Sequence, residues 1–582
     1  MNTLASPLAA PLSPLAATPV IPAGRLPSVG LRAQLLWTAK VRVLALIIGF
    51  TLVALIALVR ITSLGLAGRA PERTSMEEAL LPPRGEITDR NGAPLARAFP
   101  AYALWFEPTA MGDSGAPLVR SPQEVAAALK GVFPDIDEAR MARRLASGKP
   151  GYLRRRILPE EANRVFGLGE IALEIPRETD RYYPQGTLAA HVLGYVVEDQ
   201  GGKIGMEEVL EKRLQHPDSR VEPVALSIDV RAQGALEDEL RKGMLATNAI
   251  GAAGIVLDVD TGEVMALASL PEFDPNTAGA AGAVNVFNRA TNGVYELGST
   301  FKPLSVAAAI DAGVVRDLGK AWDATPVAVG RRTIKDLKSK GATLNVPQAL
   351  VYSSNTVTAR VADALGAERL RKTMMDLGMD RRPFIELPGK GKPLWPQGQW
   401  SRVTNMTVSY GHGLAVTPLH LASAYAAMVN GGIWRPSTLM KLDPKDVPRG
   451  RRVFKESTSH RMRQMLRMIS LYGTGKQADA VGYRVGGKTG SAEKASGGGY
   501  AKTSLVSSFA AAFPLDAPRY VVVVVLDEPK GTVASSFQRT AGYTAAPVVG
   551  KLVPRIGPML GVQPDESRDV DISDLRYLVD KH

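Results

Sequence analysis

The stretch "YELGSTFKPLSVAAAI", Tyr295 to Ile310, places a serine and a lysine three residues apart at the start of an apolar segment. Positions i and i+3 share one face of a helix, so a helix beginning here would hold the Lys302 amine beside the Ser299 hydroxyl. Pro303 is compatible with this helix because it would lie in the first turn. The same pattern also fits the capped start of an ordinary core helix, so other segments must decide whether Ser299 is a nucleophile.

The composition limits what kind of protein this chain of 582 residues can be. Its length allows three or four modules, and its 45% hydrophobic content is typical of a globular protein. The net charge of +13 would suit nucleic acid, an anionic membrane or an acidic polymer, but no basic block with interleaved aromatic residues indicates nucleic acid. The absence of cysteine excludes thiol chemistry and disulfides, and the six histidines form no metal-binding pair, so no metal is expected.

The N-terminal part of the chain predicts a membrane anchor. Residues 1–42 carry basic but no acidic residues and are predicted to form a flexible cytoplasmic tail. The uncharged run "VLALIIGFTLVALIALV" follows, and residues 43–64 are predicted to cross the membrane once. This run lies too far from the N-terminus and is too long for an ordinary cleaved signal peptide. Because the positive flank comes first, everything after the anchor should be exported, which predicts a protein of the inner membrane with a periplasmic main part.

The anchor also has a possible role in assembly. Gly49, Ala54 and Ala57 are small residues that would let another membrane helix pack closely against this one. The same residues are equally compatible with simple contact to lipid. The sequence therefore leaves both interpretations open.

Residues 65–222 mix predicted strands, helices and proline-rich turns. The Asn91-Gly92 pair in "LPPRGEITDRNGAPLA" is a strong tight-turn signal between two short strand candidates. A helix is predicted over "PQEVAAALKGVF". We therefore expect a separate β-rich domain between the anchor and the rest of the chain.

Residues 223–560 differ from the preceding segment in their pattern of predicted strands and helices. "VALSIDVRAQGALEDELRKGML" predicts a strand and a long helix, and "AGIVLDVDTGEVMALAS" predicts two strands joined by a turn at 260–262. Helical segments follow, and strands return at "YRVGGKTG", "SLVSSFAAAFP" and "RYVVVVVLDE", the last being too short for a second membrane span. This order predicts an α+β domain whose sheet is closed by sequence-distant segments around a helical subdomain. Residues 561–582 are predicted to form a C-terminal tail.

Two other serine motifs are poor candidates for a nucleophile. "GDSGAP" mimics the nucleophile loop of chymotrypsin-like proteases, but these place a histidine before the serine, whereas His191 follows Ser114. A second Ser-x-x-Lys match, Ser491 and Lys494, runs into "SGGGY", whose glycines indicate a loop. The match at Ser299 is therefore the better candidate.

A serine attacks an amide only with help from a base, and a lysine can act as that base when it is partly neutral. Burial and a second cation lower the pKa of a lysine, and Lys488 in "GGKTGS" is a suitable cation on a predicted edge strand that an extended peptide could join. "YSSNT" adds the Ser353 hydroxyl and the Asn355 amide two residues apart. Three such motifs in this order favour one shared site over unrelated cap, turn and loop.

In this order, Ser-x-x-Lys, Ser-x-Asn and Lys-Thr-Gly resemble the motifs of class B penicillin-binding proteins, which are peptidoglycan D,D-transpeptidases. "RGEITDRNGAPLA", "RYYPQGTLAAHVLGYV" and "GKIGMEE" resemble motifs of the family's non-catalytic pedestal, and "YGHGLAVTPLHLASAYAAMVNGG" resembles the helix beneath its catalytic cleft. "SYGHG", "SSNT" and "KTGSAEK" look more like the division-type (septal) enzyme than the elongation type. Ser491, where threonine is common, and His412, where an aromatic residue is common, are small departures that leave the activity intact.

The resemblance implies a fold for each domain. Residues 65–222 would be an elongated, β-rich pedestal of the dimerisation type. Residues 223–560 would be a serine transpeptidase domain with a β-lactamase-like fold, in which an antiparallel sheet is flanked by helices and joined to an all-helical subdomain.

The resemblance also implies catalytic roles. Ser299 would attack the D-Ala–D-Ala amide of a stem peptide, and Lys302 would be the base. Ser353 would relay a proton to the leaving amine. Asn355 would orient Lys302 and bind substrate, and Lys488 would depress the pKa of Lys302.

Further residues are expected to bind the substrate. Thr489 would hold its terminal carboxylate, and Gly490, Ser491 and Ser354 would line the binding site. The backbone N–H groups of Ser299 and Ser491 would form an oxyanion hole. The resemblance implies no cofactor, and its expected partners are stem peptides, β-lactams, a polytopic glycosyltransferase that polymerises the glycan strand, and other division proteins.

Three alternatives stay open on the sequence alone. A serine β-lactamase or β-lactam sensor shares the three motifs but lacks a long pedestal. A catalytically silent scaffold of the division machinery is argued against by the intact motifs. An elongation-type transpeptidase would differ in where it acts.

Overall fold

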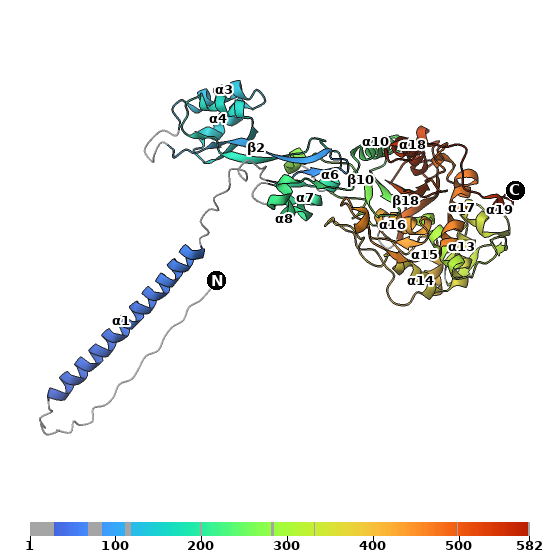
Figure 1. The fold of residues 1–582 in the computed structure, drawn as a ribbon, viewed down its shortest axis with the longest axis horizontal. Coiled ribbons are helices and arrows are strands. Elements are labelled where there is room, and N and C mark those ends of the chain that lie inside the picture. Colours follow the sequence, from blue (N-terminus) through green and yellow to red (C-terminus); the bar gives the residue numbers. More distant parts are fainter. Residues whose placement is uncertain are drawn as a thin grey trace, which may run out of the picture. The chain divides into compact units, whose positions relative to one another are not determined.

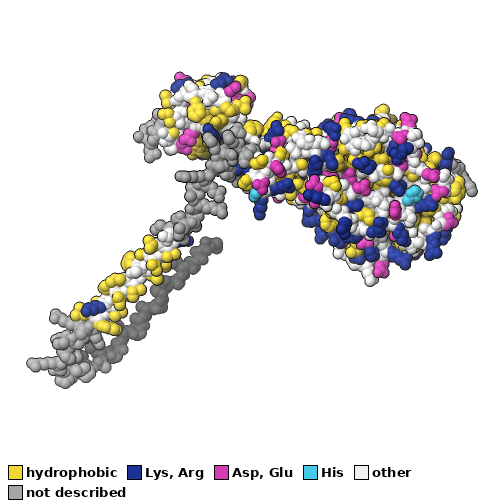
Figure 2. Space-filling model, viewed as in Figure 1, with side chains coloured by type: hydrophobic (Ala, Val, Ile, Leu, Met, Phe, Trp, Pro, Cys, Tyr) yellow, Lys and Arg dark blue, Asp and Glu magenta, His cyan; other side chains and the backbone are white. Residues whose placement is uncertain are grey.

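The computed structural model describes residues 28–67, 84–110, 118–197, 201–280, 285–330, 332–496 and 499–579, in two units with the bounds Met1–Leu80 and Leu81–His582. The first unit contains the helix α1 (Ser28–Ala67). Ala39–Arg60 is the one segment among the described residues that is long and apolar enough to cross a membrane. Figure 2 shows hydrophobic side chains along this helix, and those from Leu36 to Val59 are exposed, as lipid contact requires.

The predicted anchor lies inside α1, but the predicted tail is shorter than expected. The helix begins at Ser28 and so includes residues 28–42, which the sequence assigned to a flexible tail. These residues contain no proline after Pro27, and their leucines and alanines are good helix formers that extend the apolar run backwards. Residues 1–27 lie outside the described part of the chain.

The pedestal begins the second unit. Its elements are β1 (Ile87–Thr88), β2 (Pro94–Phe106), α3 (Pro122–Val132), α4 (Glu138–Ala146), β3 (Gly151–Ile157), α5 (Pro159–Phe166), β4 (Leu173–Glu174), β5 (Arg177–Tyr182), α6 (Ala190–Leu193), β6 (Tyr195–Val197), β7 (Gly201–Lys203), α7 (Gly205–Val209), α8 (Glu211–Gln215), α9 (Pro217–Val221) and β8 (Val224–Ala225).

The long strand β2 organises the pedestal sheet, whose order is β3-β2-β1-β8, with β4 and β5 also paired to β2. The predicted turn at Asn91-Gly92 is confirmed: β1 and β2 are antiparallel across it, and Gly92 has a φ of +86°. Asp89 Oδ1 accepts hydrogen bonds from the backbone N–H groups of Asn91 and Ala93, both at 2.8 Å. Strand β8 pairs with β1 in parallel, so the pedestal sheet reaches just beyond the predicted boundary at residue 223.

Helix α3 begins where its sequence predicts a helix. Ser121 Oγ accepts a hydrogen bond from the N–H of Glu124, whose carboxylate accepts one from the Ser121 N–H at 2.9 Å. This reciprocal capping box satisfies two backbone donors that the first turn would otherwise leave unpaired. Val125 and Leu129, one turn apart, are buried against the rest of the pedestal.

The catalytic domain contains a larger set of elements. Its first half comprises α10 (Val230–Ala246), β9 (Gly251–Asp258), β10 (Val264–Leu270), η1 (Pro275–Ala280), η2 (Gly298–Phe301), α11 (Lys302–Asp311), β11 (Trp322–Asp323), β12 (Val327–Val329), β13 (Arg332–Ile334), β14 (Thr343–Leu344), α12 (Val346–Val351), α13 (Asn355–Leu365) and α14 (Ala367–Asp376). Its second half comprises α15 (Arg402–Ser409), α16 (Pro418–Val429), β15 (Ile433–Trp434), η3 (Pro444–Asp446), β16 (Arg451–Arg452), α17 (Glu456–Tyr472), η4 (Lys476–Ala478), β17 (Gly486–Ser496), β18 (Gly499–Phe513), β19 (Tyr520–Asp527), η5 (Val533–Ser535), α18 (Ala545–Met559) and α19 (Ser573–Arg576).

A five-stranded antiparallel sheet forms the centre of this domain, in the order β10-β9-β19-β18-β17. Two strands precede the helical segments and three follow them, as the sequence predicted. β17 lies at the edge of this sheet, which fits the predicted role of "GGKTGS" as an edge strand. The valine run of β19 is wholly buried because successive side chains face opposite sides and both sides are covered.

Helices cover the two faces of the sheet. Val522 and Val524 belong to a core shared with α10 and α18, and Figure 1 shows these two helices side by side at the edge of the domain. Val521 and Val523 face the other core, which includes residues of α11, α16 and α17. The helical subdomain runs from α11 to α17 and inserts between strands β10 and β17 in the chain. These features match the predicted α+β architecture.

The C-terminal segment differs from the prediction of a tail. Residues 565–579, here named the C-terminal strap, follow α18 and pack into the catalytic domain. Val570, Leu575 and Val579 are buried in the core that contains α11 and α17. The structure describes the chain up to residue 579, so the predicted tail of 561–582 is folded over its described part.

Candidate active site

Ser299 lies in a single 3₁₀ turn, η2, which leads directly into the helix α11 at Lys302. The sequence predicted that an α-helix would begin at Ser299, so the helix starts one turn later than expected. Gly298 has a φ of +56°, and a Cβ atom there would lie 3.1 Å from the carbonyl oxygen of Ser491. A glycine before Ser299 therefore lets this turn approach strand β17 closely.

Lys302 is fully buried, and its amine is directed at the second motif. Nζ donates a hydrogen bond of 3.1 Å to Ser353 Oγ and another to the Ser353 carbonyl oxygen. Among the described residues the structure records no hydrogen bond from Lys302 to Ser299. In this state the amine therefore holds Ser353, while its place one turn after Ser299 keeps it near the nucleophile.

Lys488 completes the cluster from strand β17. It is also fully buried, and its Nζ donates to Ser353 Oγ over 3.0 Å and to Thr489 Oγ1 over 3.2 Å. Two lysine amines thus converge on one serine hydroxyl, although Ser353 and Lys488 are separated by 135 positions in the chain. The structure confirms that the three sequence motifs meet in one place.

The electrostatics of this cluster favour neutral amines. Burial, reinforced by the charge of Lys488, holds the pKa of the Lys302 amine well below its usual value, and Asp336 opposes this shift. Burial alone lowers the pKa of the Lys488 amine to about 7. Removal from water disfavours the charged form of an amine, and a like charge nearby adds to that effect. A buried lysine of this kind can accept a proton near neutral pH.

Ser353 is held in an unusual backbone conformation between α12 and α13. Its φ is +63°, in the left-handed region that residues with a side chain seldom occupy. The neighbouring Ser354 begins α13, where its Oγ accepts a hydrogen bond from the N–H of Val357 at 3.2 Å. The short turn between the two helices therefore aims the Ser353 hydroxyl at both lysines.

Asp336, which the sequence analysis missed, supports this turn. Its carboxylate accepts hydrogen bonds from the backbone N–H groups of Asn355, at 2.6 Å, and Thr356, at 2.9 Å. Ser354 Oγ donates to the same carboxylate at 2.7 Å. A negative charge at the start of α13 is stabilised by the unpaired N–H groups and the dipole of that helix. Asp336 therefore anchors the second motif from a loop that is distant in sequence.

Two residues of the second motif lie differently from their predicted roles. Asn355 Nδ2 donates to the carbonyl oxygen of Lys335 at 3.1 Å, rather than to Lys302, which it was expected to orient. Ser354 is buried, and its hydroxyl is engaged by Asp336 and the start of α13, so it supports the turn instead of lining a binding site. In the sequence, Ser354 was predicted to line the binding site because it stands between the candidate residues Ser353 and Asn355. Its position at the N-cap of α13 instead directs its hydroxyl inwards.

The third motif places its side chains along the edge strand β17. Thr489 Oγ1 shares a hydrogen bond of 2.7 Å with Thr474 Oγ1, a partner that the sequence analysis did not identify. A Cβ atom at Gly490 would lie 2.2 Å from the Leu297 carbonyl oxygen, so glycine is required for β17 to pass the turn before Ser299. Ser491 Oγ accepts a hydrogen bond from the Ala541 N–H at 3.0 Å.

The two rejected serine motifs have separate outcomes. Ser491 and Lys494 both lie on β17, and Lys494 Nζ forms ion pairs with Asp527 at 2.6 Å and Glu528 at 2.9 Å. The predicted loop at Ser491–Lys494 is wrong, since both residues lie on a strand; Lys494 is engaged by these two carboxylates and the structure gives it no bond to Ser491. The "GDSGAP" stretch around Ser114 falls outside the described residues.

The segment "SYGHG" and helix α16 pack against the 3₁₀ turn that carries Ser299. Gly411 has a φ of +83°, and a Cβ atom there would lie only 2.0 Å from the Gly298 carbonyl oxygen. Tyr425, buried on α16, donates a hydrogen bond of 2.8 Å to the carbonyl oxygen of Thr300. His412 Nδ1 contacts Glu296 Oε2 at 3.1 Å. This segment therefore packs against the turn that carries Ser299.

The described residues contain no group of three His, Asp or Glu side chains that could hold a metal ion.

Comparison with known proteins decides what this site belongs to. Residues 252–553 match the family described as the penicillin binding protein transpeptidase domain, and residues 79–255 match the penicillin-binding protein dimerisation domain. The chain belongs to the penicillin-binding protein transpeptidases. The family that the sequence motifs resemble is thereby confirmed, and so is the arrangement of a pedestal before a transpeptidase domain.

Relatives of this chain include enzymes named peptidoglycan D,D-transpeptidase FtsI. It is 39% identical to the probable peptidoglycan D,D-transpeptidase FtsI of Caulobacter vibrioides over 82% of both chains. It is 32% identical to the peptidoglycan D,D-transpeptidase FtsI of Escherichia coli K12, over 83% of this chain and 84% of that one. Its fold is similar to that of penicillin binding protein 3 from Mycobacterium tuberculosis, solved with aztreonam, at a TM-score of 0.63 and 24% identity over 83% of this chain and 98% of that one.

Proposed function

We propose that this transpeptidase cross-links the stem peptides of peptidoglycan during cell division, through an acyl-enzyme on Ser299. The observation that carries the proposal is the convergence of two buried amines, Lys302 and Lys488, on Ser353 Oγ. The pedestal argues against a β-lactamase, because such an enzyme needs only the catalytic domain. The similarity to enzymes named for division supports a septal role over an elongation role.

Acylation would begin at the neutral amine of Lys302. This amine takes the proton of the Ser299 hydroxyl as the oxygen attacks the carbonyl carbon between the two D-alanines. The negative charge on the carbonyl oxygen is then stabilised by the backbone N–H groups of Ser299 and Ser491. When the amide bond breaks, the proton returns through Lys302 and Ser353 to the departing D-alanine amine.

The second half-reaction would use the amine of another stem peptide. That amine attacks the ester on Ser299, gives its proton to the same pair of groups, and releases the Ser299 hydroxyl as the cross-link forms. Thr489 would bind the terminal carboxylate of the first peptide, with the Lys488 amine, 3.2 Å from its Oγ1, adding positive potential. Gly490 and Ser491 would contact the peptide along the edge strand β17.

Asn355 keeps a proposed role as a substrate-binding residue. Its side chain is at the surface and hydrogen-bonded to the Lys335 carbonyl oxygen, a bond that an extended peptide could replace. Ser354 is assigned a supporting role at the start of α13. No cofactor takes part in this scheme.

The location follows from the anchor. We place residues 1–27 in the cytoplasm and the second unit in the periplasm, because basic residues flank the apolar part of α1 on its N-terminal side. The membrane helix and the pedestal would bind a polytopic glycosyltransferase and other division proteins. Gly49 on α1 has nothing within 4 Å of a built Cβ, so it could accept a neighbouring membrane helix.

A labelling experiment tests the proposed nucleophile. The full chain in detergent is incubated with fluorescent penicillin, and the adduct is located by peptide mass spectrometry. A stable adduct on the peptide containing Ser299 is expected. An adduct on another residue would reject the assignment, and an adduct that is lost within seconds would indicate a β-lactamase.

A further inference from the structure

The C-terminal strap, residues 565–579, contacts the elements that carry two of the three catalytic motifs. One end of the strap is tied to the start of strand β17, which carries Lys488. The other end is tied to the start of helix α12, which leads to Ser353. Neither contact is explained by the proposed chemistry, and neither is visible in the motifs themselves.

The first tie runs through Arg467 of helix α17. Its guanidinium is buried and forms a two-pronged ion pair with Asp569 of the strap, through Nε to Oδ1 and Nη2 to Oδ2, both at 2.7 Å. Arg467 Nη1 also donates to the Val485 carbonyl oxygen at 2.9 Å and to Asp479 at 2.6 Å. Val485 immediately precedes β17, so one planar side chain joins the strap to the strand on which Lys488 lies.

The second tie runs through Asn345, which caps helix α12. Asn345 Oδ1 accepts a hydrogen bond from the Gln348 N–H at 2.8 Å, while its Nδ2 donates to the Leu578 carbonyl oxygen of the strap at 2.9 Å. One amide side chain therefore serves both the helix and the strap. Helix α12 is short, ends at Val351, and turns into Ser353, so a shift at its start moves the Ser353 hydroxyl.

Between the two ties the strap is held by helix α17. Gln464 Nε2 donates to the Asp571 carbonyl oxygen at 2.7 Å and to Asp574 Oδ1 at 2.9 Å, and Arg461 pairs with Asp574. These bonds hold the strap, including the short helix α19, against α17.

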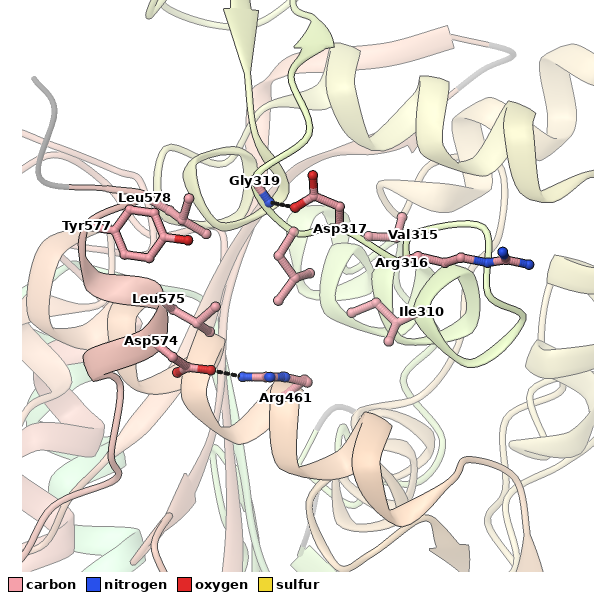
Figure 3. Close-up of a pocket in the computed structure, with 11 residues that line it drawn as sticks. Ile310, Val315, Arg316, Asp317, Gly319, Arg461, Asp574, Leu575, Tyr577 and Leu578 are labelled. Atoms are coloured by element: carbon pink, nitrogen blue, oxygen red, sulfur yellow. Dashed lines mark hydrogen bonds and ion pairs between the residues drawn. The ribbon is translucent and has the colours of Figure 1, made fainter.

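A cavity separates the strap from helix α11. Its volume is about 280 Å³, and Figure 3 shows Leu575, Tyr577 and Leu578 of the strap on one side, with Ile310 and Val315 on the other. The Arg461–Asp574 pair lies at its lower edge in this view. The strap is thus bonded to the cap of α12 and, through Arg467, to the residue before β17, whereas a cavity lies between part of it and the end of α11.

We infer that the C-terminal strap is a positioning element of the acylation reaction, which holds the Ser353 hydroxyl and the Lys488 amine in register with each other. The inference rests on the proposed roles of these two residues. A purely structural strap would contribute only buried apolar surface from Val570, Leu575 and Val579. The hydrogen bond from Asn345 and the ion pair of Asp569 connect the strap to the elements that carry Ser353 and Lys488. Removing them therefore distinguishes a positioning role of the strap from a purely structural one.

The test changes each tie without removing the apolar contacts. In Asn345→Ser the hydroxyl can still cap α12, but the donor to Leu578 is lost; in Asp569→Asn the ion pair with Arg467 is lost. The full chain in detergent is acylated with fluorescent penicillin, and the second-order rate constant is measured from pH 5 to pH 9. Each variant is expected to react on the order of 10-fold more slowly, because small displacements of catalytic groups cost this much or more.

The pH profile separates positioning from stability. If Ser353 and the two lysines separate, water enters, and the ascending limb of acylation should move to higher pH as the pKa of Lys302 rises. Lys488 and Asp336 are the charged groups that influence Lys302 here, and both are unchanged in the variants. A fall in melting temperature with an unchanged rate and pH profile at 25 °C would overturn the inference.

Two controls complete the design. Ser121→Ala removes a capping box of the same kind from α3, and Asp135→Asn removes an ion pair in which Arg154 Nη1 donates to both carboxylate oxygens, both in the pedestal. Each should leave the acylation rate unchanged.

A shortened chain gives a second test of the tie at Asn345. A chain ending at Asp571 lacks the Leu578 acceptor, so adding Asn345→Ser to it should have no further effect on the acylation rate. A further loss of rate would overturn the second tie. If that shortened chain does not fold, the point variants still decide. Failure of the unaltered chain to acylate would instead count against the proposed function.

Discussion

Lys488 Nζ donates a hydrogen bond to Ser353 Oγ over 3.0 Å, although the two residues stand 135 positions apart in the chain. Strand β17 delivers the lysine and the turn between α12 and α13 delivers the serine. Lys488 is fully buried, which favours its neutral amine, and Ser353 is half-buried beside it. Under the proposed function, this contact is the place where we expect acylation to be controlled.

Ser299→Ala should abolish covalent labelling by penicillin while the chain stays folded. The change removes one half-buried hydroxyl and leaves the hydrogen bonds between Lys302 and Ser353 in place. Gel fluorescence after labelling measures the loss, and a thermal melt checks the fold. Undiminished labelling of this variant would contradict the assignment of the nucleophile.

Lys488→Met should slow acylation by about 10-fold or more and move its ascending limb to higher pH. The Lys488 charge is one of the causes that lower the pKa of Lys302, so its removal lets that pKa rise and leaves less free base at neutral pH. The measurement is the acylation rate from pH 5 to pH 9.

Lys494→Met is the matched control for this experiment. Lys494 lies on the same strand but pairs with Asp527 and Glu528, so the variant should acylate within about 3-fold of the unaltered chain, as expected for a partly exposed ion pair. An equal effect of the two substitutions would mean that general charge on β17, and not contact with Ser353, controls the rate.

Lys302→Met should be inactive but more stable at pH 7, by about 1–2 kcal/mol, as is common when a strained functional group is replaced. Unfolded Lys302 keeps its proton up to a pKa near 10.5, whereas the folded amine loses it at lower pH. Between those two values the unfolded chain binds more protons, so the stability of the unaltered chain rises with pH across this window. In the variant this rise should shrink.

Chemical denaturation of the full chain in detergent, at pH 7 and pH 9, measures both effects. A variant that is less stable than the unaltered chain at both values would show that Lys302 is not an energetic burden in the folded state.

Asp336→Asn should slow acylation and destabilise the chain by roughly 1–2 kcal/mol, the usual range for a lost helix cap. The variant loses the negative charge that holds the N–H groups of Asn355 and Thr356 at the start of α13. Acylation rate and denaturation midpoint are the readouts. Asp323→Asn is the control, because Asp323 accepts hydrogen bonds from Thr325 and pairs with Arg360 near the surface, without contact to Ser353, and should leave acylation unchanged.

Gly411→Ala should destabilise the catalytic domain by about 2 kcal/mol or more and suppress labelling. Two terms add: strain at a φ of +83°, and a contact of 2.0 Å between the new Cβ and the Gly298 carbonyl oxygen. Gly92→Ala separates the terms, since Gly92 has a φ of +86° but open space around it. It should cost only about 1 kcal/mol. Equal losses in the two thermal melts would show that the contact with Gly298 is unimportant.

The parts of this molecule that follow from local pattern were predictable. The valine run of β19, the Asn91-Gly92 turn and the meeting of the three motifs needed only periodicity, turn chemistry and the known logic of a lysine base. The start of α11 was misplaced by a turn because Gly298 and Ser299 form a 3₁₀ turn against β17, which is a tertiary contact. Ser354 was predicted to line the binding site because it stands between Ser353 and Asn355, two candidate site residues. Its role as a helix cap depends on Asp336, which lies elsewhere in the sequence.

Other features depend on partners that are far away in the chain. Asp336 caps a helix about twenty residues later, and its own surroundings, "TIKDLKSKG", carry no cap signal. The strap reads as a tail because "PDESRDVDISDLRYLVDK" is polar and acidic. Two of its acidic residues, Asp569 and Asp574, form ion pairs with Arg467 and Arg461 of α17. These partners lie about a hundred residues earlier in the chain, so the local sequence around the strap does not predict the pairs.

The close approaches at Gly298, Gly411 and Gly490 have a consequence for drug resistance. A Cβ atom at Gly411 or Gly490 would collide with a backbone oxygen, and one at Gly298 would lie tightly, 3.1 Å from another, so main-chain contacts set the position of Ser299. Mutations at these glycines would displace Ser299 for stem peptides and for β-lactams alike. We therefore do not expect mutations there that weaken β-lactam binding and still allow cross-linking. We expect the adaptable positions to lie where side chains alone make the contact: around Asn355, along the β17 edge, and in the strap.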